Sequence, residues 1–266
     1  MKKILMILSA LVLVSSCDWF EFDNEESYDA TITGRFIDSQ TGENVQFAHP
    51  NTNTFQVIEL ESAAGRKWDA EKAQSWYVKP NGTYTNKLVF AGKYKMTTLG
   101  QNFYPVEDVA FEIKKGANTV DFTVTPYARV SDVQISYEGT DIVARFKVKA
   151  SDPSKTTNVD AFLFGFTDRF VSDGYNNFSK FSTAKKTKVA ADGNTVIELR
   201  VDTTADPKKI DSGTQFTYKR DHFLRIGVQA TGKGVNSGKY YNYSPVYMMD
   251  QNFSNVTEIT NWDEVL

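Results

Sequence analysis

The chain of 266 residues has only one cysteine, Cys17, and only two histidines, His49 and His222. A lone cysteine leaves no second thiol to pair with, so a small disulfide-stapled scaffold is excluded and stability must come from burial of apolar surface. Neither histidine has another within a helical turn, the kind of spacing that a zinc site needs. We therefore predict no metal ion and no cofactor.

An excess of charge is also missing, because 30 lysines and arginines stand against 33 aspartates and glutamates. Nucleic-acid binding needs clustered basic residues, so nucleic acid is not an expected partner. Long apolar runs are absent as well. The run at residues 4–14 is shorter than the roughly 20 residues that a membrane-spanning helix needs, so no such span is predicted.

Motifs of common enzyme classes are incomplete. Ser182-Thr183-Ala184-Lys185 has the Ser-x-x-Lys spacing of penicillin-binding serine enzymes, but that serine must open a buried helix, and here more lysines and a turn follow. Gly238-Lys239 lacks the flanking residues of a phosphate loop. The oxygen-rich loops at residues 152–154 and 173–177 do not follow the calcium-loop pattern. We predict that the protein is not an enzyme, although paired carboxylates on distant strands leave no spacing signature.

The N-terminus has the order of a secretory signal, with Met1-Lys2-Lys3 followed by the apolar residues 4–14. Val14-Ser15-Ser16-Cys17 resembles the lipobox of bacterial lipoproteins, in which the cysteine is acylated and the signal is cut before it. The sequence thus predicts a signal peptide at residues 1–16 and a stable lipid anchor on Cys17. The alternative is an ordinary cleaved signal with a cysteine nearby.

Residues 17–27 are predicted to form a lipidated acidic tether. Residues 18–26 contain five acidic side chains and no basic one, so the segment repels itself and favours an extended linker. It is similar to the acidic signal that sends Bacteroidetes lipoproteins to the outer face of the outer membrane. This similarity implies a cell-surface location, and a merely solvated linker is the alternative.

The rest of the chain is dominated by alternation of apolar and polar residues, which is typical of half-buried strands. Alternation is found at residues 30–36, 120–124, 142–148, 196–201 and 223–230. Turn signals rich in Gly, Asn, Asp and Pro occur at residues 41–44, 80–82, 91–93, 115–118, 192–194 and 232–234. Residues 63–75 have no continuous apolar face and are predicted as a loop with at most one helical turn. The fold class is therefore all-β.

A domain boundary is predicted at Pro126, because proline cannot donate into a strand ladder. Residues 28–126 resemble transthyretin-like or carboxypeptidase-regulatory-like β-sandwiches. The resemblance rests on the strand at residues 32–38, the turn Thr41-Gly42, and the segments 81–84 and 90–96, in which tyrosines follow glycine turns. Residues 127–266 resemble immunoglobulin or fibronectin type III sandwiches with a C-terminal tail, on strand number and alternation alone.

The complete order of lipobox, acidic tether and two consecutive β-sandwiches, closed by the segment at residues 241–247, resembles Bacteroidetes surface lipoproteins of the DUF3823 type. This family has no defined function, and it is often encoded beside starch-utilisation-type glycan import systems. The resemblance implies a neighbourhood rather than a reaction. It carries over no functional residues.

Aromatic side chains give the one positive indication of a binding site. Several lie outside strict alternation or in the probable loop between residues 166 and 189, where exposure would let them stack on sugar rings. The candidate ligand-binding residues are Trp68, Trp76, Tyr77, Tyr104, Phe170, Tyr175 and Phe178. The alternative is that these side chains fill the cores of their own sandwiches.

The sequence favours a non-catalytic, surface-anchored lipoprotein that binds carbohydrate as an accessory part of a glycan uptake system. Its expected partners are the membrane, through Cys17, a glycan, and an outer-membrane importer with its glycan-binding lipoprotein. The first alternative is a structural role in which sandwich edges dock an importer or surface assembly. The second is a hydrolase with carboxylates from separate loops, which two acidic side chains facing each other across a groove would favour.

Overall fold

The computed structural model describes residues 27–49, 53–63, 65, 67, 72–98, 101–176, 178–179, 181–205, 220–235 and 240–262. The predicted signal peptide, the tether with Cys17, and Trp68 lie outside the described residues. Among the described residues, no helix has the length and apolar character needed to cross a membrane.

The first half of the chain is a sandwich of two sheets. One sheet has the order β4 (Thr83–Val89), β1 (Ala30–Asp38) and β7 (Gly116–Thr119), with β8 (Phe122–Val124) also paired to β1. The facing sheet has the order β3 (Ala73–Tyr77), β2 (Thr54–Ser62), β5 (Gly92–Thr98) and β6 (Val106–Ile113). Strand β1 is antiparallel to β4 and parallel to β7 and β8.

Aromatic rings fill the space between these two sheets. Phe36 of β1 lies with its ring centroid 5.1 Å from that of Phe55 and 5.5 Å from that of Phe122. Tyr84 is buried beside them, and its hydroxyl donates a 2.6 Å hydrogen bond to the carbonyl of Val120. The alternation of β1 places Ile32 and Phe36 in this core, as one buried face requires.

The second half is another sandwich. Its smaller sheet has the order β13 (Asp192–Asp202), β10 (Asp141–Ala150) and β9 (Ala128–Glu138). The larger sheet has the order β12 (Lys185–Lys186), β11 (Thr156–Phe166), β14 (His222–Gly232), β16 (Tyr247–Met249) and β17 (Val256–Glu258), with β15 (Asn242–Tyr243) also paired to β14. Aliphatic residues such as Val148, Leu163 and Ile226 dominate its core.

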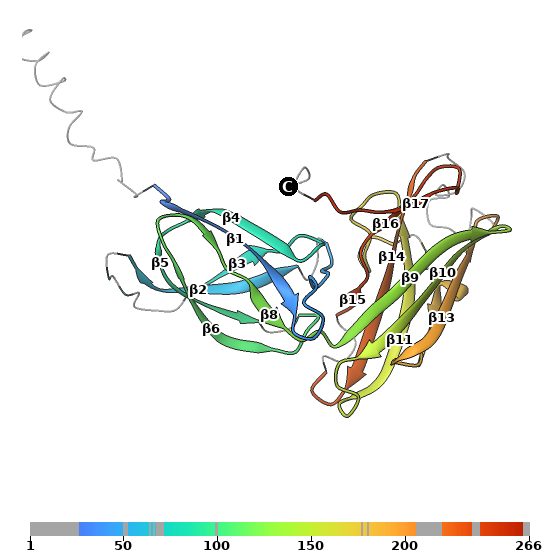
Figure 1. Ribbon diagram of the computed structural model, residues 1–266, viewed down its shortest axis with the longest axis horizontal. Coiled ribbons are helices and arrows are strands. Elements are labelled where there is room, and N and C mark those ends of the chain that lie inside the picture. The colour runs from blue at the N-terminus through green and yellow to red at the C-terminus, as the bar shows by residue number, and fades with distance from the viewer. Residues whose placement is uncertain are drawn as a thin grey trace, which may run out of the picture.

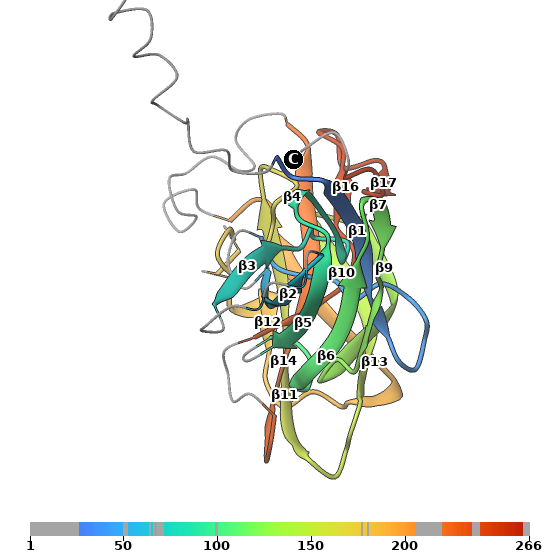
Figure 2. The ribbon, with the colours of Figure 1, turned by 90° about the vertical axis from the view of Figure 1, so that its left-hand side faces the viewer.

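The prediction of an all-β chain built from two consecutive sandwiches is confirmed. Figure 1 shows the sandwiches side by side, with the chain passing from β8 to β9 at their junction, and in Figure 2 the first sandwich lies in front of the second. Some local predictions were wrong. Several predicted turns lie partly in strands, because residues 92–93 begin β5, residues 116–118 belong to β7 and residues 192–194 begin β13. Residues 73–75, predicted as part of a loop, begin β3.

Buried polar contacts join the two sandwiches. Arg225 on β14 donates to the carbonyls of Phe47 and Pro80 at 2.7 and 3.2 Å, and both acceptors belong to the first sandwich. The side-chain amide of Asn242 donates to the carbonyl of Asn102 at 2.5 Å. Because buried polar groups need such partners, these contacts fix how the two sandwiches meet.

Candidate functional site

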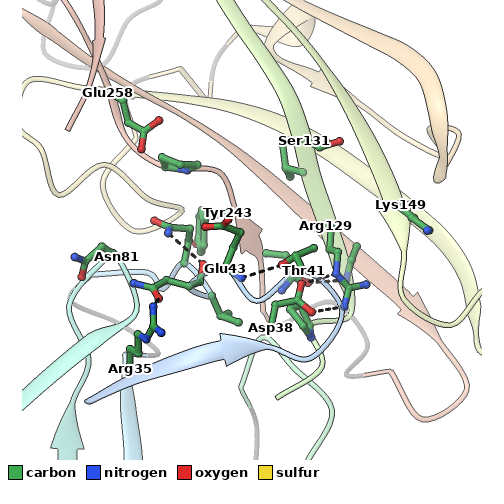
Figure 3. Close-up of a pocket in the computed structure, with 18 of the residues that line it drawn as sticks. Arg35, Asp38, Thr41, Glu43, Asn81, Arg129, Ser131, Lys149, Tyr243 and Glu258 are labelled. Carbon is green, nitrogen blue, oxygen red and sulfur yellow. Dashed lines mark hydrogen bonds and ion pairs between the residues drawn. The ribbon is translucent and has the colours of Figure 1, made fainter. Parts of the chain in front are cut away.

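A groove of about 660 Å³ lies between the two sandwiches, and residues of both line it. The first sandwich contributes the end of β1 and the two turns that follow β1 and β3. The second contributes β9, the neighbouring ends of β10 and β13, and the segments around β15 and β17. Figure 3 shows these side chains around the open space, with Glu258 and Asn81 on one side and Lys149 at the opposite end.

Asp38 and Arg129 form one end of the groove (Figure 3). The guanidinium of Arg129 binds both carboxylate oxygens of Asp38, and the contact from Nη2 to Oδ1 measures 2.6 Å. Its third nitrogen, Nη1, donates to the hydroxyl of Ser151 at 2.7 Å. A bidentate pair of this kind fixes both side chains, so Asp38 is committed to holding the two sandwiches together.

The wall from the first sandwich is held in place by local hydrogen bonds. Arg35 donates its backbone N–H to Asp121 at 3.0 Å, and its side chain contacts the same carboxylate at 3.3 Å. The Asn81 carboxamide accepts from the backbone and hydroxyl of Thr83 at 3.2 and 2.8 Å. Glu43 lies in the turn after β1 and is exposed to solvent. The wall therefore presents polar groups at fixed backbone positions.

The wall from the second sandwich includes Tyr243, whose ring is only 7% exposed. The guanidinium carbon of Arg225 lies 4.4 Å from the Tyr243 ring centroid, and the Tyr243 hydroxyl donates to Asp173 at 2.6 Å. Burial raises the pKa of Tyr243 well above its usual 10, so the phenol stays neutral. Tyr243 therefore acts as a rigid part of the wall.

The ionisable side chains that line the groove balance in sign. Arg35, Arg129 and Lys149 are basic, and Asp38, Glu43 and Glu258 are acidic. Glu43, Lys149 and Glu258 are exposed to solvent, so their charged ends can reach a ligand. The groove thus combines hydrogen-bond donors and acceptors without a net charge.

Two of the aromatic residues predicted to bind ligand are buried, which corrects the expectation that they are exposed. Trp76 is 5% exposed because the alternation of β3 turns it inward against Phe55, at 5.8 Å between ring centroids. Phe178 is fully buried and lies against Gly165, where an added Cβ would come within 2.5 Å of its ring. Neither ring can stack on a sugar.

The other candidate residues are scattered. Tyr77 is 69% exposed on the edge strand β3, and Tyr175 is 40% exposed in the loop after β11. Tyr104 is half-buried against Tyr127, and Phe170 is half-buried 4.2 Å from the ring of His49. None of the described candidates lines the groove. Whether the exposed ones bind ligand stays a prediction.

Sequence reasoning missed the groove because no local pattern marks it. Its polar residues lie in turns and strand ends, where Asp, Asn and Gly normally serve turn chemistry. Sequence analysis also missed a second cluster of aromatic side chains on β11. Phe162 and Phe164 lie on the face of this strand that points away from the core between the two sheets of the second sandwich. Their rings are 5.8 Å apart, and both pack on Tyr241. The sequence does indicate this cluster, because apolar residues on both faces of β11 mean that both faces are covered by other side chains.

Comparison with known proteins identifies the first sandwich. Residues 30–125 match the family described as "Protein of unknown function (DUF3823) N-terminal domain". Residues 30–125 are therefore similar to the N-terminal domain of the DUF3823 family. The predicted resemblance to this family is confirmed. No protein of curated function matches the chain in sequence.

Solved structures resemble both sandwiches together. A candidate carbohydrate-binding protein from Bacteroides uniformis shares 29% identity with a TM-score of 0.71, over 84% of this chain and 99% of its own. DUF3823 family proteins from Bacteroides ovatus and Parabacteroides merdae share 20% and 21% identity, with TM-scores of 0.62 and 0.61. The alignments cover 84% and 83% of this chain, and 99% and 98% of theirs. None of these descriptions names an enzyme.

Proposed function

We propose that the protein captures a neutral glycan in the groove between its two sandwiches without altering it chemically. The observation that carries this proposal is the groove itself, whose volume of about 660 Å³ is typical of ligand sites and whose partly apolar walls carry hydrogen-bonding side chains from both sandwiches. The similarity to a candidate carbohydrate-binding protein over nearly all of that protein's length supports the same class of ligand.

The lining favours a neutral, hydroxyl-rich ligand. Three basic and three acidic side chains line the groove, so a ligand with a strong charge of either sign would meet as much repulsion as attraction. A sugar hydroxyl can donate to Glu43 or Glu258 and accept from Lys149. The same set of side chains can therefore hold several hydroxyls at once.

Hydrolysis is the second candidate, because Glu43 and Glu258 come from the two opposite walls of the groove. A glycosidase keeps its general acid in apolar surroundings, which hold that carboxyl group protonated. Both glutamates are exposed to solvent instead, and Asp38 is committed to Arg129. The surroundings thus favour binding over hydrolysis.

Calorimetry with neutral oligosaccharides of glucose, xylose and mannose tests the proposal. Glu43→Gln and Glu258→Gln should each weaken binding about tenfold, because a hydrogen bond to a charged group is lost. Glu112→Gln is the matched control, since Glu112 is exposed on β6 and does not line the groove. No binding to any of these glycans would overturn capture. Release of reducing sugar that either groove variant abolishes would favour hydrolysis instead.

We further propose that the protein works as a lipid-anchored component on the outer face of the outer membrane, beside a glycan importer. This part rests on the lipobox-like segment ending at Cys17 and on the acidic residues after it. Metabolic labelling with a fatty acid should mark the wild-type protein and leave the Cys17→Ala variant unmarked. Surface proteolysis of intact cells then reports which side of the membrane the protein faces.

A further inference from the structure

Three chain segments converge at the end of the first sandwich where β1 begins. Ala30 pairs with Val89 at the end of β4 and with Gly116 at the start of β7. Asp29 ties the segments together, because its side chain accepts from the N–H of Ala91 at 2.8 Å and its carbonyl accepts from Gly116 at 2.9 Å. We call this end the N-terminal tip and define it by Tyr28, Lys87, Leu88, Phe90, Lys114 and Lys115.

The N-terminal tip exposes two large apolar side chains to solvent. Leu88 is 64% exposed and Tyr28 is 53% exposed, while the Tyr28 ring lies 4.8 Å from that of Phe90. Only four large apolar side chains among the described residues are more than half exposed, and these two share one end of the fold. An apolar cluster at one place on a surface indicates a contact surface more strongly than scattered residues do.

Three lysines also lie at the N-terminal tip. Lys87 and Lys114 are exposed, and the Lys115 side chain is 77% exposed with its Nζ 3.4 Å from Asp29. Tyrosine, leucine and phenylalanine with lysine at the rim are the side chains that suit the interface of a lipid bilayer, where rings and aliphatic groups enter and ammonium groups meet phosphate.

The length of the chain before the tip brings it within reach of the predicted anchor. Ser27 follows Cys17 by ten residues, and a chain of that length spans at most about 35 Å. A surface held this close to the bilayer meets it at a high effective concentration, so a small apolar contact is enough to populate the docked arrangement.

We propose that the N-terminal tip docks on the lipid surface that carries the anchor. Five acidic residues at 18–26 oppose attraction to an anionic surface, so the apolar side chains make the contact and the lysines lie at the level of the phosphates. The inference rests on the lipid-anchor part of the proposed function, and it does not depend on which glycan binds.

Docking at the tip would set the position of the groove. Strand β1 begins at the tip with Ala30 and ends with Asp38 on the groove wall, eight residues further on. At about 3.3 Å per residue, the strand holds the groove roughly 26 Å from the tip. The groove would therefore stand clear of the lipid surface and open to arriving glycan.

The test uses the full acylated chain in vesicles of phosphatidylcholine and phosphatidylethanolamine. Cys17 is the only cysteine, so in the acylated protein Leu88→Cys provides one free thiol for an environment-sensitive fluorophore. Val196→Cys is the matched control, because Val196 is 58% exposed on β13 of the second sandwich. With a nitroxide quencher on the lipid, we expect a blue-shifted emission and several-fold stronger quenching at position 88 than at position 196.

The outcomes separate this inference from the proposals it rests on. A protein that floats with vesicles but shows equal, water-like emission at both positions overturns docking and leaves the anchor standing. A protein that does not float refutes the anchor, and with it this inference, whereas glycan binding is measured separately. A blue shift at position 88 without vesicles that grows with protein concentration would assign the tip to a second copy of the chain and also overturn docking.

Discussion

Arg225 and Phe47 are joined by a 2.7 Å hydrogen bond across the junction of the two sandwiches, although 178 positions separate them in the chain. The guanidinium also donates to the carbonyls of Ser244 and Pro80 at 2.8 and 3.2 Å. Burial lowers the pKa of Arg225 to about 10, so the group stays charged at neutral pH and needs all of these acceptors. This contact makes the groove between the sandwiches a fixed feature.

Replacing Arg225 should destabilise the whole molecule. Arg225→Met removes the donor to the carbonyls of Phe47 and Ser244 and one of the two donors to Pro80, and we expect a loss of at least about 3 kcal/mol in the free energy of unfolding. Scanning calorimetry should show separate transitions for the two sandwiches. Arg145→Met is the control and should lower the stability much less, because Arg145 pairs with Glu138 and Glu198 on an accessible face. A single, unshifted transition for Arg225→Met would show that Arg225 is not needed for stability or for coupling the two sandwiches.

Asp38 should contribute far more to the stability of the fold than a comparable carboxylate at the surface. The side chains of the Arg129–Asp38 pair are 11% and 7% exposed, whereas those of the Arg35–Asp121 pair are 48% and 34% exposed. Asp38→Asn leaves a buried guanidinium without its counter-charge, so we expect a loss of about 3 kcal/mol by urea unfolding. Asp121→Asn should cost less than about 1 kcal/mol. Equal losses would contradict the idea that burial makes the first pair structural.

Acid should weaken the junction through His49. Burial lowers the pKa of His49 below its usual 6.5, although Asp168 acts in the opposite direction. The unfolded chain therefore takes up a proton at a higher pH than the folded one, and stability contributed by neutral His49 is lost as the pH falls through 6.5 towards the lower folded value. His49→Gln should flatten this part of the curve of stability against pH. An NMR titration of His49 at or above 6.5 would refute the explanation.

Strands with one buried face could be predicted from the sequence. Short strands that form only by pairing with a strand far away in the chain could not. The alternation of β1, β10 and β14 reflects burial of one side, a property that each segment carries in itself. Residues 115–118 were predicted as a turn because glycine and asparagine are typical turn residues, and Gly116 does have a positive φ of 87°, yet parallel pairing with β1 makes residues 116–119 a strand. Residues 192–194 combine a turn-like Gly193 with a bulge opposite Lys147 and Lys149.

The groove could not be predicted at all, because its walls meet only through tertiary structure. Asp38 and Arg129 lie 91 positions apart, and neither has a neighbour that marks it as more than a strand residue. The aromatic prediction failed at Trp76 for a related reason. Only the pairing of β3 with β2 determines that Trp76, rather than Tyr77, points into the core.

Gly34 should be irreplaceable despite its place in a regular strand. A Cβ at this position would lie 1.8 Å from the carbonyl oxygen of Val120 and 2.7 Å from the Tyr84 hydroxyl. Gly34→Ala must push apart β1 and the segment before β8, so we expect a loss of more than about 2 kcal/mol by urea unfolding. Thr33→Ala is the control on the exposed neighbour and should cost within about 1 kcal/mol. A Gly34→Ala variant as stable as the wild type would mean that β1 and the Val120 carbonyl can move apart without loss of stability.

The balance of charge in the groove predicts that glycan binding is insensitive to salt. Attractive and repulsive Coulomb terms largely cancel for a neutral ligand, so Kd should change less than about twofold between about 0.05 and about 0.5 M salt. Oligogalacturonate of matched length should bind no more tightly than a neutral oligosaccharide, because Glu43 and Glu258 repel its carboxylates. Calorimetry at both salt concentrations checks this. Affinity that falls steeply with salt, or a preference for the uronate, would mean that Arg35 and Lys149 dominate and that the ligand is anionic.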